Sequence, residues 1–360
     1  MACDARPWSA ETDNDSAESP PPHVDSALLK QRRRLETKID KVLDDWFVLG
    51  IHRAGAKKFI QDRIANPDDA ECSRLRHWWL LQLNGRVWAH GLPLMCHASE
   101  NVPGLRSHHV WPSESLPWLH TVEGHFAQIR EELLAARSDG VSRISGFQPY
   151  RDPVGAHREA AADGLGAEGV DRGAWNVLYL HLNHKRFDEN CERFPATVRA
   201  IDEVFPRHYC HAFFSALTPG SHIMKHHGPS NRMLRTWLPI CGMEGFRLRV
   251  GDTMVSPEEG KAFAWDHSFE HEAWHDGAET RIVLIVDVWH PDLTEPEVKF
   301  LRSLQNCRLR AGRALVEMSA GDRTHEEATY FEIVDRARHL LSSDDWWVIN
   351  AERDPTTKAT

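Results

Sequence analysis

The 360-residue chain has no uninterrupted apolar run of about 18 residues, the length that a membrane-spanning helix needs. Its first 24 residues are polar, rich in proline and serine, and unlike the apolar segment of a secretory signal. Basic residues do not dominate, because 43 lysines and arginines stand against 53 acidic residues. This balance argues against a nucleic-acid footprint spread over the chain. We therefore expect a cytoplasmic protein that binds neither membranes nor nucleic acid.

Paired cysteines are also missing. The seven cysteines are scattered, odd in number, and form no C-x-x-C motif. This pattern argues against a disulfide scaffold and against a structural zinc ribbon, and it suits a reducing compartment. Histidine and tryptophan are abundant instead, with 23 and 14 residues. Because histidine is the commonest metal ligand, the positions of the histidines are the most informative feature of the sequence.

The chain divides into four segments of different composition. Residues 1–25 are rich in proline and serine and predict a disordered tail. Residues 26–89 carry apolar residues at helical spacing and predict a helical extension. Residues 90–292 hold most of the expected strands and form the predicted core domain. Residues 293–360 return to helical spacing and predict a helical C-terminal extension.

Short β-type runs separated by glycine, proline and aspartate dominate the core domain. The runs cover residues 175–182, 212–217, 233–240, 246–250, 261–265 and 281–288. Helices are expected over residues 122–136 and 194–204. Many short strands joined by such turns predict a sandwich or barrel of antiparallel sheet. The predicted fold class is therefore a mainly β core with flanking helices.

Two histidines and one arginine have the spacing of a metal site with an anion partner. His226 lies in a histidine-rich segment, His271 follows 45 positions later, and Arg281 begins the most apolar strand. Alone, a histidine-rich segment is more often solvated surface than a metal site. Two neutral imidazoles on neighbouring strands, however, can hold a divalent metal and leave several coordination positions open. An arginine facing the interior needs an anion, and its planar guanidinium matches a carboxylate.

This combination fits non-haem Fe(II) chemistry with 2-oxoglutarate as cosubstrate and O2 as oxidant. The usual ligand set is two histidines and one carboxylate, the latter two residues after the first histidine. That position is Gly228 in this sequence. From the residues alone, the third protein ligand is either missing or supplied from elsewhere, and Asp266 is one candidate to supply it.

Three ordered motifs resemble the aspartyl/asparaginyl β-hydroxylase family. They are HHGPSN at residues 226–231, WDHSFEHEAW at 265–274 and ETRIVLIVDVWHP at 279–291. The resemblance covers residues 175–291, with a fainter echo at 118–134. It implies a double-stranded β-helix, a jelly-roll or cupin-like fold. It also implies an iron held by only two histidines, since the family has glycine in the place of the carboxylate.

The resemblance carries site roles over to individual residues. His226 and His271 are the implied Fe(II) ligands. Arg281 is implied to pair with the distal carboxylate of 2-oxoglutarate. Ser215 matches a family serine that also binds the cosubstrate.

Two residues of the following strand complete the implied cosubstrate site. Arg235 matches a family arginine next to the cosubstrate, and Trp237 stands where the animal enzymes have a histidine that contacts it. Because alternate residues of a strand share a face, we expect Trp237 to line the same pocket as Arg235. Asp287 lies on the same strand face as Arg281, and a structural ion pair is its expected role.

The resemblance implies hydroxylation at the β-carbon of an aspartyl or asparaginyl side chain, in a peptide or a smaller molecule. Two alternatives stay open. In the first, the chain is a non-catalytic binding module of the same fold, in which Trp237 blocks the cosubstrate. In the second, it is a two-histidine metallohydrolase or cupin-type dioxygenase that uses no oxo-acid. Arg281 argues against the second alternative, because such an enzyme does not need an inward guanidinium at this place.

Overall fold

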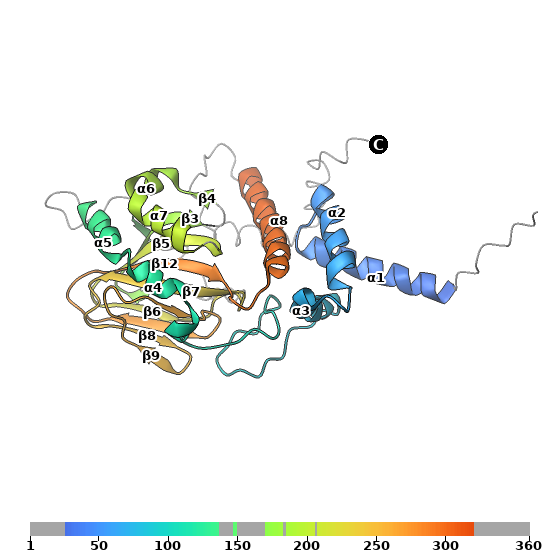
Figure 1. Ribbon diagram of the computed structural model, residues 1–360, viewed down its shortest axis with the longest axis horizontal. Helices are drawn as coiled ribbons and strands as arrows, with labels where there is room; N and C mark the ends of the chain where they lie inside the picture. The colour runs from blue at the N-terminus through green and yellow to red at the C-terminus, as the bar shows by residue number, and fades with distance from the viewer. Residues whose placement is uncertain (1–25, 137–146, 150–169, 183–184, 206, 320–360) are drawn as a thin grey trace, which may run out of the picture. The chain divides into compact units, whose positions relative to one another are not determined.

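The computed structural model describes residues 26–136, 147–149, 170–182, 185–205 and 207–319 (Figure 1). The chain divides into two compact units, residues 1–41 and 42–360. The described part of the first unit belongs to helix α1 (Ser26–Asp45). The tail expected at residues 1–25 lies outside the described residues. The other expected domain boundaries stay predictions.

Helices precede, interrupt and follow the strands. They are α1, α2 (Gly50–Phe59), α3 (Ser73–Leu83), α4 (Trp118–Glu123), α5 (Phe126–Ala135), α6 (Asp188–Arg193), α7 (Pro195–Val204) and α8 (Glu295–Ser319), with short helical turns η1 (Ile60–Ile64), η2 (Ala70–Cys72) and η3 (Ser113–Ser115). The helix expected over residues 122–136 is in fact two helices, α4 and α5. Gly124 follows the end of α4, and glycine has a low helix propensity that favours a break there.

The strands form two antiparallel sheets. They are β1 (Gln148–Pro149), β2 (Val170–Arg172), β3 (Trp175–Leu182), β4 (Lys185–Arg186), β5 (His208–Leu217), β6 (Ser221–His226), β7 (Met233–Cys241), β8 (Phe246–Val250), β9 (Thr253–Val255), β10 (Phe263–Trp265), β11 (His271–His275) and β12 (Arg281–Trp289). The larger sheet has the order β1-β3-β5-β12-β7-β10, with β4 beside β3. The smaller sheet has the order β2-β6-β11-β8-β9.

Strands β5 to β12 alternate between the two sheets along the chain, apart from the β8–β9 hairpin. Their order is β5-β12-β7-β10 in the larger sheet and β6-β11-β8-β9 in the smaller sheet. Pairing of the first of these eight strands with the last is the connectivity of a double-stranded β-helix, a form of jelly roll. The predicted fold class is therefore confirmed. All six expected β-type runs of the core domain are strands, although β5 begins at residue 208 and β10 at 263.

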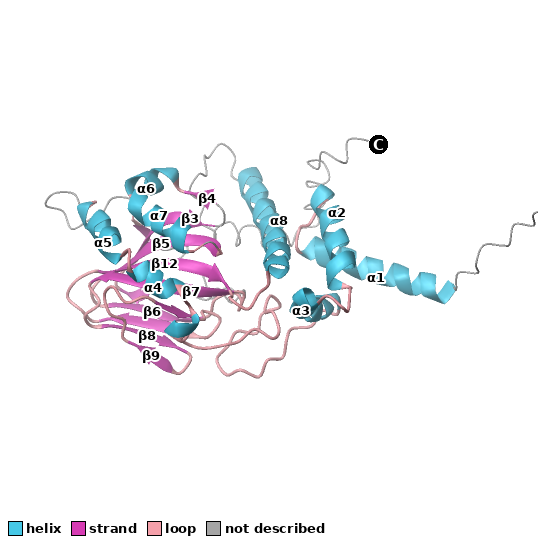
Figure 2. Ribbon diagram, viewed as in Figure 1, coloured by secondary structure: helices cyan, strands magenta, loops and turns pink. Residues whose placement is uncertain are grey.

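Alternate residues of strand β12 enter two different cores. Leu284 and Val286 pack in a cluster with residues of α4, α5, α6 and α7, which cover the outer face of the larger sheet (Figure 2). Val283 and Ile285 pack in a second cluster that also contains residues of the smaller sheet. Arg281 has the same strand parity as this second pair, so its side chain enters the space between the sheets.

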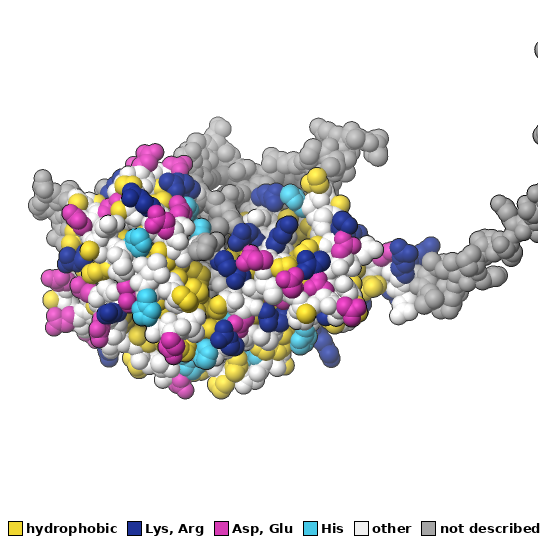
Figure 3. Space-filling model, viewed as in Figure 1, with side chains coloured by type: hydrophobic (Ala, Val, Ile, Leu, Met, Phe, Trp, Pro, Cys, Tyr) yellow, Lys and Arg dark blue, Asp and Glu magenta, His cyan; other side chains and the backbone are white. Residues whose placement is uncertain are grey.

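Surface features agree with the balanced composition. On the face drawn in Figure 3, acidic and basic side chains are interspersed over the described residues. No helix in the described part of the chain has the length and apolar character that a membrane span needs.

Candidate active site

The end of β6 and the start of β11 bring His226 and His271 together. The two residues are directly paired across the neighbouring strands, and their ring centroids lie 4.1 Å apart. Nδ1 of His226 lies 2.8 Å from the carbonyl of Met224, and Nδ1 of His271 lies 2.8 Å from the carbonyl of Phe269. Because a carbonyl only accepts, Nδ1 is the donor in both rings. Nε2 of each neutral ring then carries the lone pair that binds a metal.

The electrostatic surroundings of His271 favour a neutral ring. Burial lowers the pKa of His271 well below its ordinary value, and the neighbouring His226 lowers it further. Neutral imidazole is the form that binds a metal ion. Across the described residues, no group of three or more His, Cys, Asp or Glu side chains is arranged to hold a metal. The two histidines therefore fit a divalent ion that keeps several coordination positions for other ligands.

The loop that follows His226 is fixed by contacts outside the sheets. Arg232 is 1% exposed, and its guanidinium lies 5.1 Å from the ring centroid of Trp46 and 5.0 Å from that of Trp78. Its Nε donates to the carbonyl of Glu100. The amide of Asn231 exchanges hydrogen bonds with the backbone of residue 102. The first histidine therefore stands at the beginning of an immobilised segment.

Gly228, in the place of the usual carboxylate, lies against His267. Its N–H donates to the carbonyl of His267 at 2.6 Å. A Cβ built on Gly228 would lie 1.5 Å from Nδ1 of the same histidine. This is far inside van der Waals contact, so no side chain fits at residue 228 while His267 keeps its position. The sequence leaves the third protein ligand open, and the structure gives a steric reason for the glycine.

Asp266, the sequence-based candidate for a third ligand, is fully buried beside this segment. Its Oδ1 accepts hydrogen bonds from the N–H and the hydroxyl of Ser268 at 2.9 and 2.6 Å. Its Oδ2 has no hydrogen-bond partner within the described residues. Burial raises the pKa of this carboxyl to about 6, although the Ser268 hydrogen bonds lower it. The contacts of Asp266 are those of a turn-stabilising residue.

The raised pKa of Asp266 predicts a pH dependence of stability. The unfolded carboxyl ionises near its ordinary 3.8, whereas the folded one ionises at about 6. The contribution of the protonated Asp266 carboxyl to the free energy of unfolding is therefore fully present below about pH 4, and it is lost as the pH rises to about 6. Asp266→Asn keeps the acceptor for Ser268 and removes the ionisation. At about pH 8 it is expected to raise the free energy of unfolding by up to about 3 kcal/mol relative to the wild type.

Urea unfolding at about pH 4 and pH 8 measures this difference. The two proteins should differ at pH 8 and agree closely at pH 4. An equal difference at both pH values would show that ionisation of Asp266 is not its cause.

Arg281 lies between the sheets at the start of β12. It is 1% exposed, and its Nη1 donates to the carbonyl and the hydroxyl of Ser215 at 3.1 and 3.2 Å. Its Nε has no acceptor among the described residues. Burial lowers the pKa of the guanidinium to about 9, so that it stays charged at neutral pH. A buried charge without a counter-ion is costly, and this donor is therefore suited to an anionic ligand.

Aromatic rings enclose the guanidinium of Arg281. Its central carbon lies 5.0 Å from the ring centroid of Trp237 and 4.5 Å from that of Phe246. The indole N–H of Trp175 donates to the hydroxyl of Ser215 at 2.9 Å. The structure therefore brings Ser215, Trp237 and Arg281 into one buried cluster.

Trp265, for which the sequence predicted no site role, connects this cluster to the histidine pair. Its ring centroid lies 5.8 Å from that of Trp237 and 4.7 Å from that of His271. The indole N–H groups of Trp237 and Trp265 are buried and have no acceptor in the described part of the chain. Strand β10 pairs with β7, so that Phe263 lies opposite Trp237 and Trp265 lies opposite Arg235. A row of rings thus runs from Arg281 to His271.

Arg235 pairs with a buried carboxylate. Its Nε and Nη2 donate to the two oxygens of Asp287 at 2.8 and 2.9 Å, and Nδ1 of His211 lies 3.2 Å from Oδ2 of the same carboxylate. Burial opposes ionisation of Asp287, yet the ion pair with Arg235 prevails and holds its pKa well below the ordinary range. Six residues of strand, about 20 Å, separate Asp287 from Arg281. The cosubstrate role of Arg235 stays a prediction.

Comparison with known proteins identifies the segment that contains these residues. Residues 123–291 match the family model described as Aspartyl/Asparaginyl beta-hydroxylase. This segment is similar to the aspartyl/asparaginyl β-hydroxylase family. The predicted resemblance is confirmed.

Two curated relatives illustrate how much of the family the chain spans. The human aspartyl/asparaginyl beta-hydroxylase is 33% identical over 138 residues, which cover 37% of this chain and 18% of that protein. The ornithine lipid ester-linked acyl 2-hydroxylase of Rhizobium tropici is 28% identical over 208 residues, which cover 57% of this chain and 66% of that protein. The chain therefore spans less than two thirds of either relative.

One solved structure that matches part of this chain is a prolyl-4-hydroxylase of Pseudomonas putida. It is 13% identical, has a TM-score of 0.27, and the match covers 52% of this chain and 91% of that chain.

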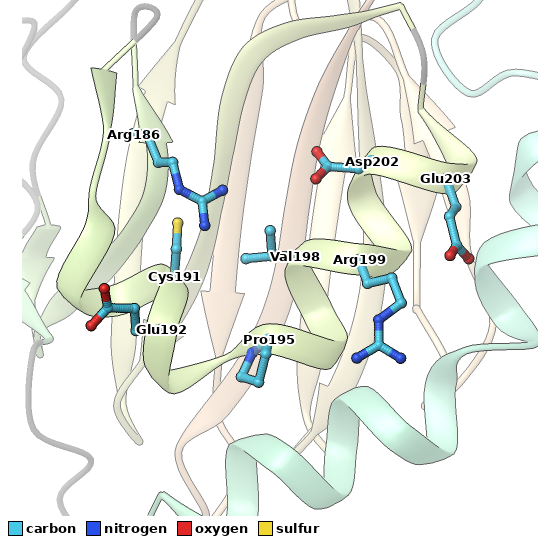
Figure 4. A pocket seen from close by; sticks show the side chains of 8 residues that line it. All are labelled: Arg186, Cys191, Glu192, Pro195, Val198, Arg199, Asp202 and Glu203. Atoms are coloured by element: carbon cyan, nitrogen blue, oxygen red, sulfur yellow. The ribbon is translucent and has the colours of Figure 1, made fainter.

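A separate surface pocket lies on the helices α6 and α7 (Figure 4). It has a volume of about 650 Å³ and mixes charges of both signs, with side chains that include Arg186, Arg199, Glu192 and Asp202. Its lining contains none of the residues assigned to the candidate active site.

Proposed function

We propose that the family segment is an Fe(II)- and 2-oxoglutarate-dependent hydroxylase. One observation carries the proposal: a buried guanidinium without a carboxylate partner among the described residues enters the same inter-sheet space as two paired histidines. A two-histidine metalloenzyme without an oxo-acid needs the histidines but has no use for this charge. A dicarboxylate that chelates a metal at one end needs both groups.

Different residues of the candidate active site bind the metal, bind the cosubstrate and exclude water in the proposed reaction. Bound Fe(II), with 2-oxoglutarate and O2, supplies the oxidant for an unactivated C–H bond. His226 and His271 hold the metal through Nε2, and the carbonyls that accept from Nδ1 fix the orientation of both rings. Arg281 binds the distal carboxylate of the cosubstrate, and Ser215 holds the guanidinium in place. The neighbouring aromatic rings exclude water from this contact.

Trp237 replaces the histidine of the animal enzymes as a donor to the cosubstrate. Trp237→Phe retains an aromatic ring and removes the indole N–H that has no acceptor among the described residues. Losing one hydrogen bond of about 0.5–1.5 kcal/mol should weaken 2-oxoglutarate binding by about 2- to 12-fold. Calorimetry with a redox-inert divalent metal measures the change.

Trp118→Phe is the matched control. Its indole N–H donates within the protein, to Thr236 at 3.3 Å, and its ring packs against the outer cluster of the larger sheet. Its removal should leave 2-oxoglutarate affinity unchanged. Equal affinities for both variants and the wild type would place the indole of Trp237 outside the cosubstrate contact. Tighter binding by Trp237→Phe would instead favour the blocked, non-catalytic module.

The proposed prime substrate is an aspartyl or asparaginyl side chain, hydroxylated at the β-carbon, in a peptide or a small molecule. The name of the human relative supports this class. The Rhizobium tropici relative, whose match covers more of this chain, is named for the ester-linked acyl group of an ornithine lipid. Hydroxylation at carbon 2 of an acyl chain is therefore the second candidate reaction.

Mass spectrometry tests the reaction and both substrate classes together. The chain is purified without oxygen, loaded with Fe(II) and 2-oxoglutarate, mixed with Asp- and Asn-containing peptides, free amino acids or ornithine lipid, and exposed to air. We expect succinate together with one substrate that gains a single oxygen atom. If 2-oxoglutarate binds but no succinate forms with any substrate, the chain is a binding module. Oxidation of a substrate without 2-oxoglutarate would favour the two-histidine enzyme.

A further inference from the structure

His267 occupies space that a carboxylate ligand would need. In the usual ligand set, the carboxylate reaches the metal from the residue two positions after the first histidine. Here a Cβ on that residue, Gly228, would fall 1.5 Å from Nδ1 and 2.1 Å from Cε1 of His267. The ring of His267 therefore stands at the point from which the third protein ligand would extend.

His267 also has an unused polar atom in this place. The residue is 2% exposed, and its Nε2 has no hydrogen-bond partner within the described residues. Buried polar atoms in proteins almost always have a partner. The ring lies against Gly228, two residues after His226, and His267 itself is four positions before His271. A ligand bound by these two histidines would lie near His267.

We propose that His267 is a positioning residue that takes over the role of the missing carboxylate. Its Nε2 forms a hydrogen bond with the oxygen atom that occupies the third coordination position, and this oxygen belongs to a molecule other than the protein chain. The inference rests on the proposed metal site. The oxygen belongs either to water or to the carboxylate of the cosubstrate, and both present the same hydrogen-bonding chemistry. His267 does not bind the metal itself. It excludes a ligand carboxylate from residue 228 and orients the group that takes its place.

This arrangement makes His267 and a carboxylate at residue 228 mutually exclusive. Gly228→Asp alone places its side chain inside the ring of His267, so it should lower Tm and weaken metal binding. Gly228→Asp combined with His267→Ala removes the ring and admits a third protein ligand. The double variant should therefore bind metal at least as tightly as the wild type. Such recovery is the non-additive behaviour of two groups that compete for one position.

Calorimetric titration of the full chain with Mn(II) alone measures these effects without turnover. His267→Ala and His267→Phe should each weaken Mn(II) binding about 10- to 100-fold, the usual effect of losing a residue that orients the ligands of a metal. His267→Phe retains a ring and removes Nε2, so it separates the hydrogen bond from the filling of space. Gly228→Asp with His267→Phe should remain as poor as Gly228→Asp alone. Thermal unfolding of each variant shows whether it is folded.

Repeating the titration with 2-oxoglutarate present identifies the oxygen. An effect of His267→Phe in both titrations assigns it to water, and an effect only with 2-oxoglutarate assigns it to the cosubstrate. Wild-type affinity of both His267 variants in both titrations would overturn the proposal. So would a Gly228→Asp variant with unchanged Tm and unchanged Mn(II) affinity. Succinate formation separates the two proposals. If the variants show the expected Mn(II) affinities but no succinate forms, only the proposed hydroxylase function is refuted. If succinate forms but the variants do not show these Mn(II) affinities, only the proposed role of His267 is refuted.

Discussion

Replacing Arg281 with methionine is expected to abolish succinate formation while leaving the protein at least as stable as the wild type. The guanidinium is buried and pairs with no carboxylate among the described residues. Its removal therefore relieves the cost of a desolvated charge and leaves no unpaired anion there. The lost charge-assisted contact to the distal carboxylate should raise the required 2-oxoglutarate concentration by about 10²-fold or more. Succinate assays and thermal unfolding without cosubstrate measure the two effects.

Arg235→Met is the matched control for stability. This arginine forms a bidentate ion pair with the fully buried Asp287. Its removal strands a buried carboxylate and should lower the free energy of unfolding by about 3–5 kcal/mol. The same substitution to methionine is therefore expected to lower stability at residue 235 but not at residue 281. A large loss of stability in Arg281→Met, or retained succinate formation at low 2-oxoglutarate, would contradict the proposed role of Arg281.

Replacing His271 with alanine is expected to remove metal binding. Only two protein side chains are proposed to hold the ion, so the loss of one leaves a single ligand. The affinity for Mn(II) should fall by at least about 10²-fold, and succinate formation should stop. His226→Ala should have the same effect, because both rings are held in the same way by a backbone carbonyl.

His222→Ala is the matched control for the metal ligands. His222 lies on the same strand as His226, but its ring nitrogens lie 3.0 Å from Asp171 and 2.8 Å from Glu272. Its removal breaks surface contacts and should leave Mn(II) affinity unchanged. A His271→Ala variant that binds Mn(II) like the wild type would place the metal elsewhere.

The fold could be predicted because its signals are local. Short apolar runs separated by turn residues marked the strands of the core domain, and three motifs indicated the family. The alternation along β12 also placed Arg281 and Asp287 on one face, and both side chains are buried. The break between α4 and α5 was missed because the apolar spacing continues across Gly124.

The contacts around the site could not be predicted, because they depend on how distant strands are paired. Nothing in the sequence near Gly228 indicates that His267 fills the adjoining space. Likewise, Trp265 is 28 residues from Trp237, and their proximity follows from the pairing of β10 with β7. The partner of Arg235 was also hidden, because Asp287 lies on a strand 52 residues away. Spacing along one strand predicts a shared face, but it does not identify the neighbours across the sheet.

In the proposed site, the metal on the histidine pair and the guanidinium of Arg281 hold one molecule of 2-oxoglutarate from its two ends. Calorimetric titration of the oxygen-free chain with 2-oxoglutarate, with and without Mn(II), tests this arrangement. The Mn(II)-loaded wild type should bind 2-oxoglutarate, whereas the metal-free wild type and Mn(II)-loaded Arg281→Met should bind little. Equal binding of 2-oxoglutarate with and without Mn(II), or by the wild type and Arg281→Met, would contradict this arrangement.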